Sequence, residues 1–134
     1  MDARLIEIAD SCLRGAESDR MSFPEIVGAL MEAGFESYAI DFRSASATYY
    51  RPDGASVVLA THARAGSIAD RFDRDTIVAA IRHAQSGAAD YTYKGFCACI
   101  MAGGCAGYIV SFPGRRALYF GRTAETHVEH FPDT

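Results

Sequence analysis

Residues 30–42 read LMEAGFESYAIDF, and residues 100–112 read IMAGGCAGYIVSF, so much of the first stretch returns seventy positions later. The correspondence also continues beyond these two stretches. The identical pairs are Met31/Met101, Gly34/Gly104, Tyr38/Tyr108, Phe42/Phe112 and Tyr49/Tyr119, and the similar pairs are Leu30/Ile100, Ile40/Val110 and Tyr50/Phe120. One shared offset over these pairs indicates a duplicated structural unit. The repeat predicts architecture and carries no chemistry of its own.

Each copy of the repeat begins with the signature of an amphipathic helix. In the first copy Ser22 can cap the helix, Pro24 suits its first turn, and Glu25 can complete a capping box. Thr92 is the expected cap in the second copy, and Gly34 supplies the left-handed residue that ends the first helix. The expected buried stripes are Phe23, Ile26, Val27, Leu30 and Met31 in the first copy, and Tyr93, Phe96, Cys97, Ile100 and Met101 in the second.

After Gly34 the hydrophobic period changes to alternation, which is typical of a half-buried strand. Tyr38, Ile40 and Phe42 are expected on one face of that strand. Further strands are expected through residues 48–50, 57–59, 108–112, 117–120 and 126–131. A further amphipathic helix precedes each copy, one ending near Gly15 and one starting at Asp73. Residues 61–72 are small and polar, and we interpret them as the joint between the units.

The sequence therefore predicts an α+β fold made of two helix-helix-strand-strand-strand units in a single domain, residues 1–134. Unit one covers about 1–65 and unit two about 70–134. We expect the units to be related by a pseudo-twofold axis, with helices packed on one face of an antiparallel or mixed sheet. Whether the two sheets merge into one is left open at this stage.

Composition narrows the class of protein. With 134 residues and 49% apolar content, the chain can bury a core without a disulfide or a metal. The net charge is −4 and the arginines are scattered, which disfavours nucleic-acid binding. No apolar run is long enough to cross a membrane, and the chain starts with charged Asp2 and Arg4 where a signal peptide would be apolar. We expect a cytoplasmic protein with free thiols.

The densest group of titratable residues is Glu125-Thr126-His127-Val128-Glu129-His130. In a strand, Glu125, His127 and Glu129 share one face, and a histidine between two carboxylates can act as an acid, a base or a metal ligand. An exposed strand face would have the same pattern. We expect His62 and His83 to be isolated.

The four cysteines, Cys12, Cys97, Cys99 and Cys105, do not have the spacing of a zinc site. Cys97 and Cys99 lie two residues apart on a helix, so their side chains point in nearly opposite directions. Packing is the favoured role, with Cys99 the thiol expected to be exposed, and neither a metal nor another cofactor is expected. The repeated tyrosines Tyr38, Tyr108, Tyr49 and Tyr119 are expected in the core, with a ligand-binding groove as the alternative.

Two longer patterns extend over most of the chain. The first is Phe23-Pro24-Glu25-Ile26-Val27-x2-Leu30-x3-Gly34-x3-Tyr38-x-Ile40-Asp41, and the second runs from Tyr93-x2-Phe96-Cys97 to Glu125-x-His127-x-Glu129-x-Phe131-Pro132. Together they resemble the YbcV-like, or phage-envelope-like, family of small bacterial and prophage proteins, a family of unknown function. The resemblance implies a compact cytosolic protein of a kind spread by mobile elements, and it brings no reaction, substrate or cofactor.

The leading functional expectation is a non-enzymatic binding or protein-interaction module. It would use the cleft between its halves, or an exposed sheet edge, for a small ligand or a protein partner, and self-association through that edge would give a homodimer. No contact with nucleic acid or membrane is expected. The alternatives are an enzyme using His127 with Glu125 or Glu129, by acid–base or metal-assisted chemistry, and a phage-related structural component.

Overall fold

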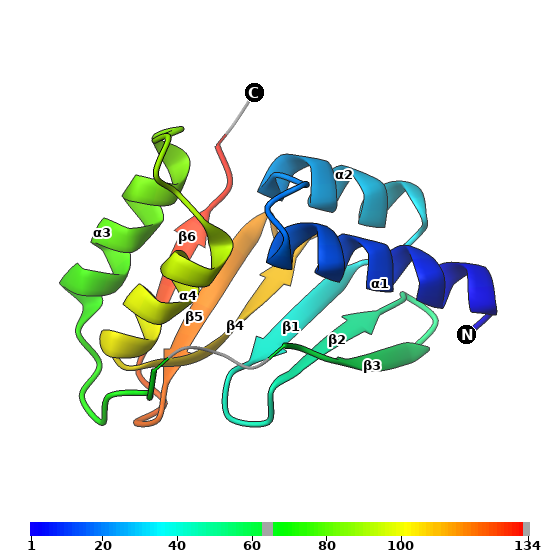
Figure 1. Cartoon of the computed structure of the whole chain (residues 1–134). Coiled ribbons are helices and arrows are strands. Elements are labelled where there is room, and N and C mark those ends of the chain that lie inside the picture. The colour runs from blue at the N-terminus through cyan, green and yellow to red at the C-terminus, as the bar shows by residue number, and fades with distance from the viewer. Residues whose placement is uncertain (63–65, 133–134) are drawn as a thin grey trace.

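The computed structural model of the chain describes residues 1–62 and 66–132, so part of the expected joint, residues 63–65, lies outside the described residues. Four helices and six strands are formed by the described residues (Figure 1). The helices are α1 (Ala3–Glu17), α2 (Phe23–Glu32), α3 (Arg74–Gln85) and α4 (Tyr93–Ala102). The strands are β1 (Ser37–Asp41), β2 (Ser46–Tyr50), β3 (Ser56–Ala60), β4 (Cys105–Ser111), β5 (Arg116–Gly121) and β6 (Thr126–His130). The expected order of elements is confirmed in both units.

All six strands belong to one antiparallel sheet with the order β3-β2-β1-β4-β5-β6, so the two units share a sheet. At its centre β1 pairs with β4, and Ala39 lies opposite Ile109, which is its own counterpart seventy residues later. The flanking pairs are reciprocal, Tyr38 with Val110 and Ile40 with Tyr108. The two halves therefore pair through equivalent strands at the centre of the sheet, as the subunits of a twofold-symmetric dimer do.

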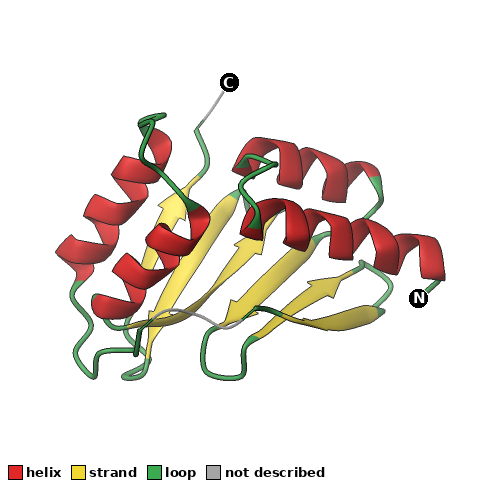
Figure 2. Ribbon diagram, in the orientation of Figure 1, coloured by secondary structure: helices red, strands yellow, loops and turns green. Residues whose placement is uncertain are grey.

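The four helices lie together on one face of this sheet (Figure 2). Within each unit the two helices pack against each other, α1 on α2 and α3 on α4. The core fills the space between the helices and the sheet, and its most deeply buried large side chains include Leu30, Ile77, Ile100, Met101 and Val110. In the described part of the chain, no helix is long and apolar enough to span a membrane.

The expected helix starts are confirmed. The Ser22 hydroxyl accepts from the Glu25 N–H at 3.3 Å, and the Glu25 carboxylate accepts from the Ser22 N–H at 2.9 Å, which completes the capping box. Asp73 and Thr92 cap α3 and α4. The end predicted near Gly15 is wrong by two residues, because α1 continues to Glu17.

The two copies of the repeat differ in burial, and the stripe predicted for α2 is partly wrong. Ile26 and Leu30 are buried, whereas Phe23 is 46% exposed and Met31 is 54% exposed. Only part of the apolar face of α2 is therefore buried against the rest of the protein. On α4 the counterpart of Met31, Met101, is fully buried, and the segment before α3 reaches that end of the helix, where the Ala69 N–H donates to the Met101 carbonyl.

Candidate functional site

His127 and Glu129 meet on the helix-facing side of β6, as expected, and two arginines of α3 join them there. Nε2 of His127 lies 3.0 Å from one carboxylate oxygen of Glu129. Arg74 Nε donates to His127 Nδ1 at 3.0 Å, and Arg82 donates to the other Glu129 oxygen. Since a guanidinium only donates and a carboxylate only accepts, Nδ1 accepts from Arg74 and Nε2 donates to Glu129. Both nitrogens of the imidazole are therefore engaged in hydrogen bonds within the protein.

The His127–Glu129 end of this network is enclosed, whereas the two arginines reach it from exposed positions on α3. The His127 side chain is 7% exposed, and its ring stacks on Tyr119 with the ring centroids 6.4 Å apart. Burial by itself would raise the pKa of Glu129, but hydrogen bonds from Arg82 and His127 outweigh burial and lower that pKa. The side chains thus form an ionic and hydrogen-bonded connection between β6 and α3.

Glu125 does not belong to this network, and it lies just before the strand in which the sequence analysis placed it. It precedes β6, and its carboxylate accepts from the Thr123 hydroxyl at 2.8 Å in an exposed turn. Ala124, with a φ of +65°, reverses the chain direction just before it. The two arginines were not foreseen, because they lie on α3, far from β6 in the sequence.

Replacement of the Glu129 charge tests this structural role. We expect Glu129→Gln to lower the free energy of unfolding at pH 7 by on the order of 1 kcal/mol, because two charge-assisted hydrogen bonds are weakened. The pKa of Glu129 is lowered in the fold, so its contribution is present above the ordinary carboxyl value of 4.5 and is lost as the pH falls through the folded value. Urea denaturation at pH 7 and at a pH of about 4 should show the difference between the two proteins shrinking in acid, as Glu129 begins to be protonated.

Glu125→Gln is the matched control, because Glu125 is an exposed carboxylate four residues away whose hydrogen-bonding side chain among the described residues is that of Thr123. Its effect should stay within about 0.5 kcal/mol at both pH values. Equal losses in the two variants, or a Glu129→Gln deficit that persists unchanged in acid, would contradict the network.

The four repeated tyrosines lie in the core. Tyr38, Tyr49, Tyr108 and Tyr119 are between 2% and 8% exposed, on the helix-facing side of the sheet. Their rings pack in pairs, Tyr38 on Tyr49 and Tyr108 on Tyr119, and the Tyr108 hydroxyl lies 2.7 Å from that of Tyr93. Burial raises the pKa of all four phenols well above the ordinary value. These tyrosines fill the space between the layers, as the packing interpretation predicts.

The cysteines are free, and Cys99 alone among them is exposed. Burial raises the pKa of Cys97 to about 12 and that of Cys105 to about 11, so these thiols are poor nucleophiles. In the described residues, no three His, Cys, Asp or Glu side chains are grouped closely enough to hold a metal ion. Cys99 is therefore the thiol that solvent can reach.

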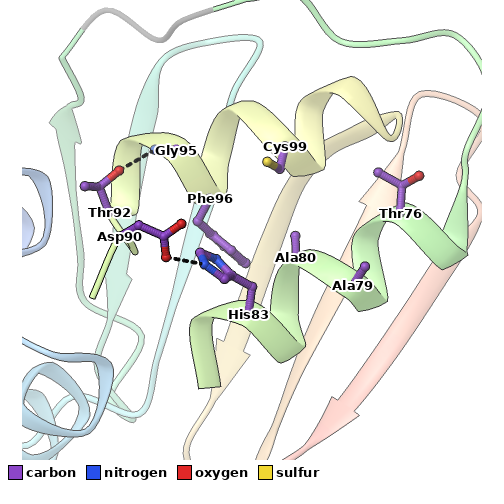
Figure 3. A pocket seen from close by; sticks show the side chains of 9 residues that line it. All are labelled: Thr76, Ala79, Ala80, His83, Asp90, Thr92, Gly95, Phe96 and Cys99. Atoms are coloured by element: carbon purple, nitrogen blue, oxygen red, sulfur yellow. Dashed lines mark hydrogen bonds and ion pairs between the residues drawn. The ribbon is translucent and has the colours of Figure 1, made fainter. Parts of the chain in front are cut away.

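A hollow of about 440 Å³ opens between α3 and α4 on the surface of this helix pair (Figure 3). It is lined mainly by small side chains and backbone, including Ala79 and Ala80 of α3 and Gly95 of α4. At one end His83 Nε2 lies 2.9 Å from Asp90 Oδ1, so His83 is not isolated as the sequence suggested. The same prediction is wrong for His62, whose Nδ1 lies 2.9 Å from Glu17 Oε1. The partner of His83 was missed because the connection between the helices folds back over the end of α3. Both side chains are largely exposed, 47% for His83 and 84% for Asp90.

The face of the sheet opposite the helices carries a continuous row of side chains that are apolar except for one threonine. Strand pairing aligns one residue from every strand in what we call the cross-strand row: Val58, Thr48, Ala39, Ile109, Leu118 and Val128. Val58 is 64% exposed and Ile109 is 42% exposed. The row is symmetric about the centre of the sheet, because Val58 and Val128 occupy equivalent positions of the repeat. The positions on either side of it are mostly polar, among them Asp41 and Arg116, and they also include the aromatic residues Tyr50 and Phe120.

Comparison with known proteins adds no family assignment: no protein-family model matches the chain, and no curated protein matches it.

Proposed function

We propose that this protein is a non-enzymatic interaction module that binds a protein partner on the helix-free face of its sheet. The observation that carries the proposal is the cross-strand row. An apolar strip with a polar border has the composition of a protein-binding surface, in which a dry centre is surrounded by a wetter rim. Val58 and Ile109 would lose exposed apolar surface on binding, which is favourable.

The size of the surface fits a reversible contact. Six strands spaced about 4.8 Å apart, each about 17 Å long, give a face of roughly 480 Å². Counting both partners, such a contact stays below the roughly 1,200 Å² at which standard stable interfaces begin. We therefore propose that the partner bound on this face associates transiently and is not a permanent subunit. The state of His127 supports binding over catalysis, because both ring nitrogens are already bonded.

The test uses two variants that each replace an exposed apolar residue by lysine. Ile109→Lys changes the middle of the cross-strand row, and Met31→Lys changes the 54% exposed side chain on the helix layer. Tagged proteins are expressed in the source cells, and the proteins retained by each are quantified by mass spectrometry. We expect Ile109→Lys to reduce the main retained protein at least about tenfold, as expected when a central contact residue is lost, and Met31→Lys to leave it unchanged. Equal retention by wild type and Ile109→Lys would refute the proposal.

A further inference from the structure

The two edge strands of the sheet are equivalent in the repeat but differ in how their edges are protected. β6 reads THVEH over residues 126–130, and its charged side chain Glu129 is tied to α3. β3 reads SVVLA over residues 56–60 and contains neither a charged residue nor a proline. Natural proteins usually protect a free edge with such residues, because an unpaired strand is a template for another strand. The edge of β3 lacks this protection.

The hydrogen-bonding groups that β3 presents outward can be assigned from its ladder. The Arg51 N–H donates to Ala55 and the Thr61 N–H donates to Ala45, so the odd-numbered residues face β2. The even-numbered residues, Ser56, Val58 and Ala60, therefore direct their N–H and C=O groups away from the sheet.

Only the end of this edge is occupied within the described part of the chain. Arg14 Nη2 donates to the Ala60 carbonyl at 3.0 Å, and the His62 N–H donates to Glu17 at 2.8 Å. The Ala60 carbonyl keeps a second lone pair for another donor. Among the described residues, none is hydrogen-bonded to the outward groups of Ser56 and Val58.

We propose that a second copy of the chain pairs along this edge, with β3 antiparallel to the partner's β3 about a twofold axis through Val58. In this register Val58 exchanges two hydrogen bonds with the partner's Val58, and Ser56 lies opposite the partner's Ala60. Val57 lies opposite the partner's Leu59, on the helix-facing side where both residues already pack against the core. Every cross-strand pair is neutral, so no like charges meet.

The self-pairing of β3 is favoured over its pairing with β6 of another copy. A β3–β6 contact would place Val57 or Leu59 opposite Glu129 or His127, which are bound to the arginines of α3. That contact is also head-to-tail and would continue into a filament, whereas the β3–β3 contact closes after two chains. The chain already contains one symmetric antiparallel pairing of equivalent strands, since β1 and β4 pair reciprocally about Ala39 and Ile109.

The test uses the proposed register, in which Val58 lies opposite the same residue of the second copy. A five-residue edge buries little surface, so the wild-type dimer should have a Kd on the order of 10–100 µM, which sedimentation velocity over a concentration series can measure. Val58→Lys and Val58→Glu each place two like charges opposite one another and should each weaken the dimer more than tenfold. An equimolar mixture of the two variants should restore dimers, because lysine then faces glutamate.

Two controls separate this contact from other modes of association. Val128→Lys alters the equivalent edge position of β6, and Ile109→Lys alters the middle of the helix-free face; both should leave the dimer intact. Val58 is 64% exposed, and far-ultraviolet circular dichroism will verify that its variants fold. The inference is overturned if wild type stays monomeric throughout, if the mixture forms no dimer, or if Val128→Lys or Ile109→Lys is as disruptive as Val58→Lys. A dimer lost only in Ile109→Lys would move self-association to the helix-free face and leave the proposed function standing.

Discussion

Gly104→Ala is expected to lower the free energy of unfolding by about 3–5 kcal/mol. The repeat provides a control for this substitution, because the equivalent glycine of the first unit can be replaced in the same way. Gly104 ends α4 with a φ of +89°, a region that costs residues with a Cβ about 1–2 kcal/mol. A Cβ added there would also lie 2.0 Å from the Arg71 carbonyl oxygen and 3.0 Å from the Phe72 Cα. Both are backbone atoms that hydrogen bonding holds in place, since the adjacent Asp73 N–H donates to Gly103.

Gly34→Ala is the matched control for this substitution. Gly34 occupies the same position at the end of α2, with a φ of +91°, but an added Cβ meets the Arg51 guanidinium at 3.1 Å. That group is the end of a flexible side chain and can move. We expect a loss of about 1–2 kcal/mol, the backbone cost alone. Urea denaturation of both variants measures the difference, and equal losses would show that the contact with Arg71 is not a constraint.

Much of the fold could be predicted because its signals are local. The capping box of Ser22 and Glu25, the glycines that end α2 and α4, and the alternation from Tyr38 to Phe42 each depend on neighbouring residues. The repeat also predicted the pseudo-twofold relation between the two units, since equivalent strands tend to associate symmetrically. The merging of the sheets was left open, because it depends on the pairing of β1 with β4 across a large separation in the sequence.

The parts of the candidate site that the sequence did not predict depend on long-range contacts. His127 appeared as a histidine flanked by two carboxylates, but Arg74 binds its ring and Arg82 binds Glu129, and both arginines lie on α3. His83 finds Asp90 only because the chain folds back after α3. The cross-strand row is likewise set by register, because a shift of one residue in any strand would remove that strand's member from the face.

Met101→Ala is expected to cost about 3 kcal/mol, whereas Met31→Ala, the same substitution seventy residues earlier, should change stability by less than about 0.5 kcal/mol. Met101 is fully buried, and its removal leaves a cavity among core side chains that cannot fully collapse. Met31 is 54% exposed, and alanine is a good helix former, so little packing is lost there.

The comparison isolates burial, because the residue type, the substitution and the position in the last turn of the helix are the same in both copies. Urea denaturation should show a lower midpoint for Met101→Ala with an unchanged slope, and a midpoint for Met31→Ala close to that of wild type. Similar losses in the two variants would mean that α2 is covered as fully as α4. The exposure of Met31, and with it the choice of Met31→Lys as a neutral control for partner binding, would then be incorrect.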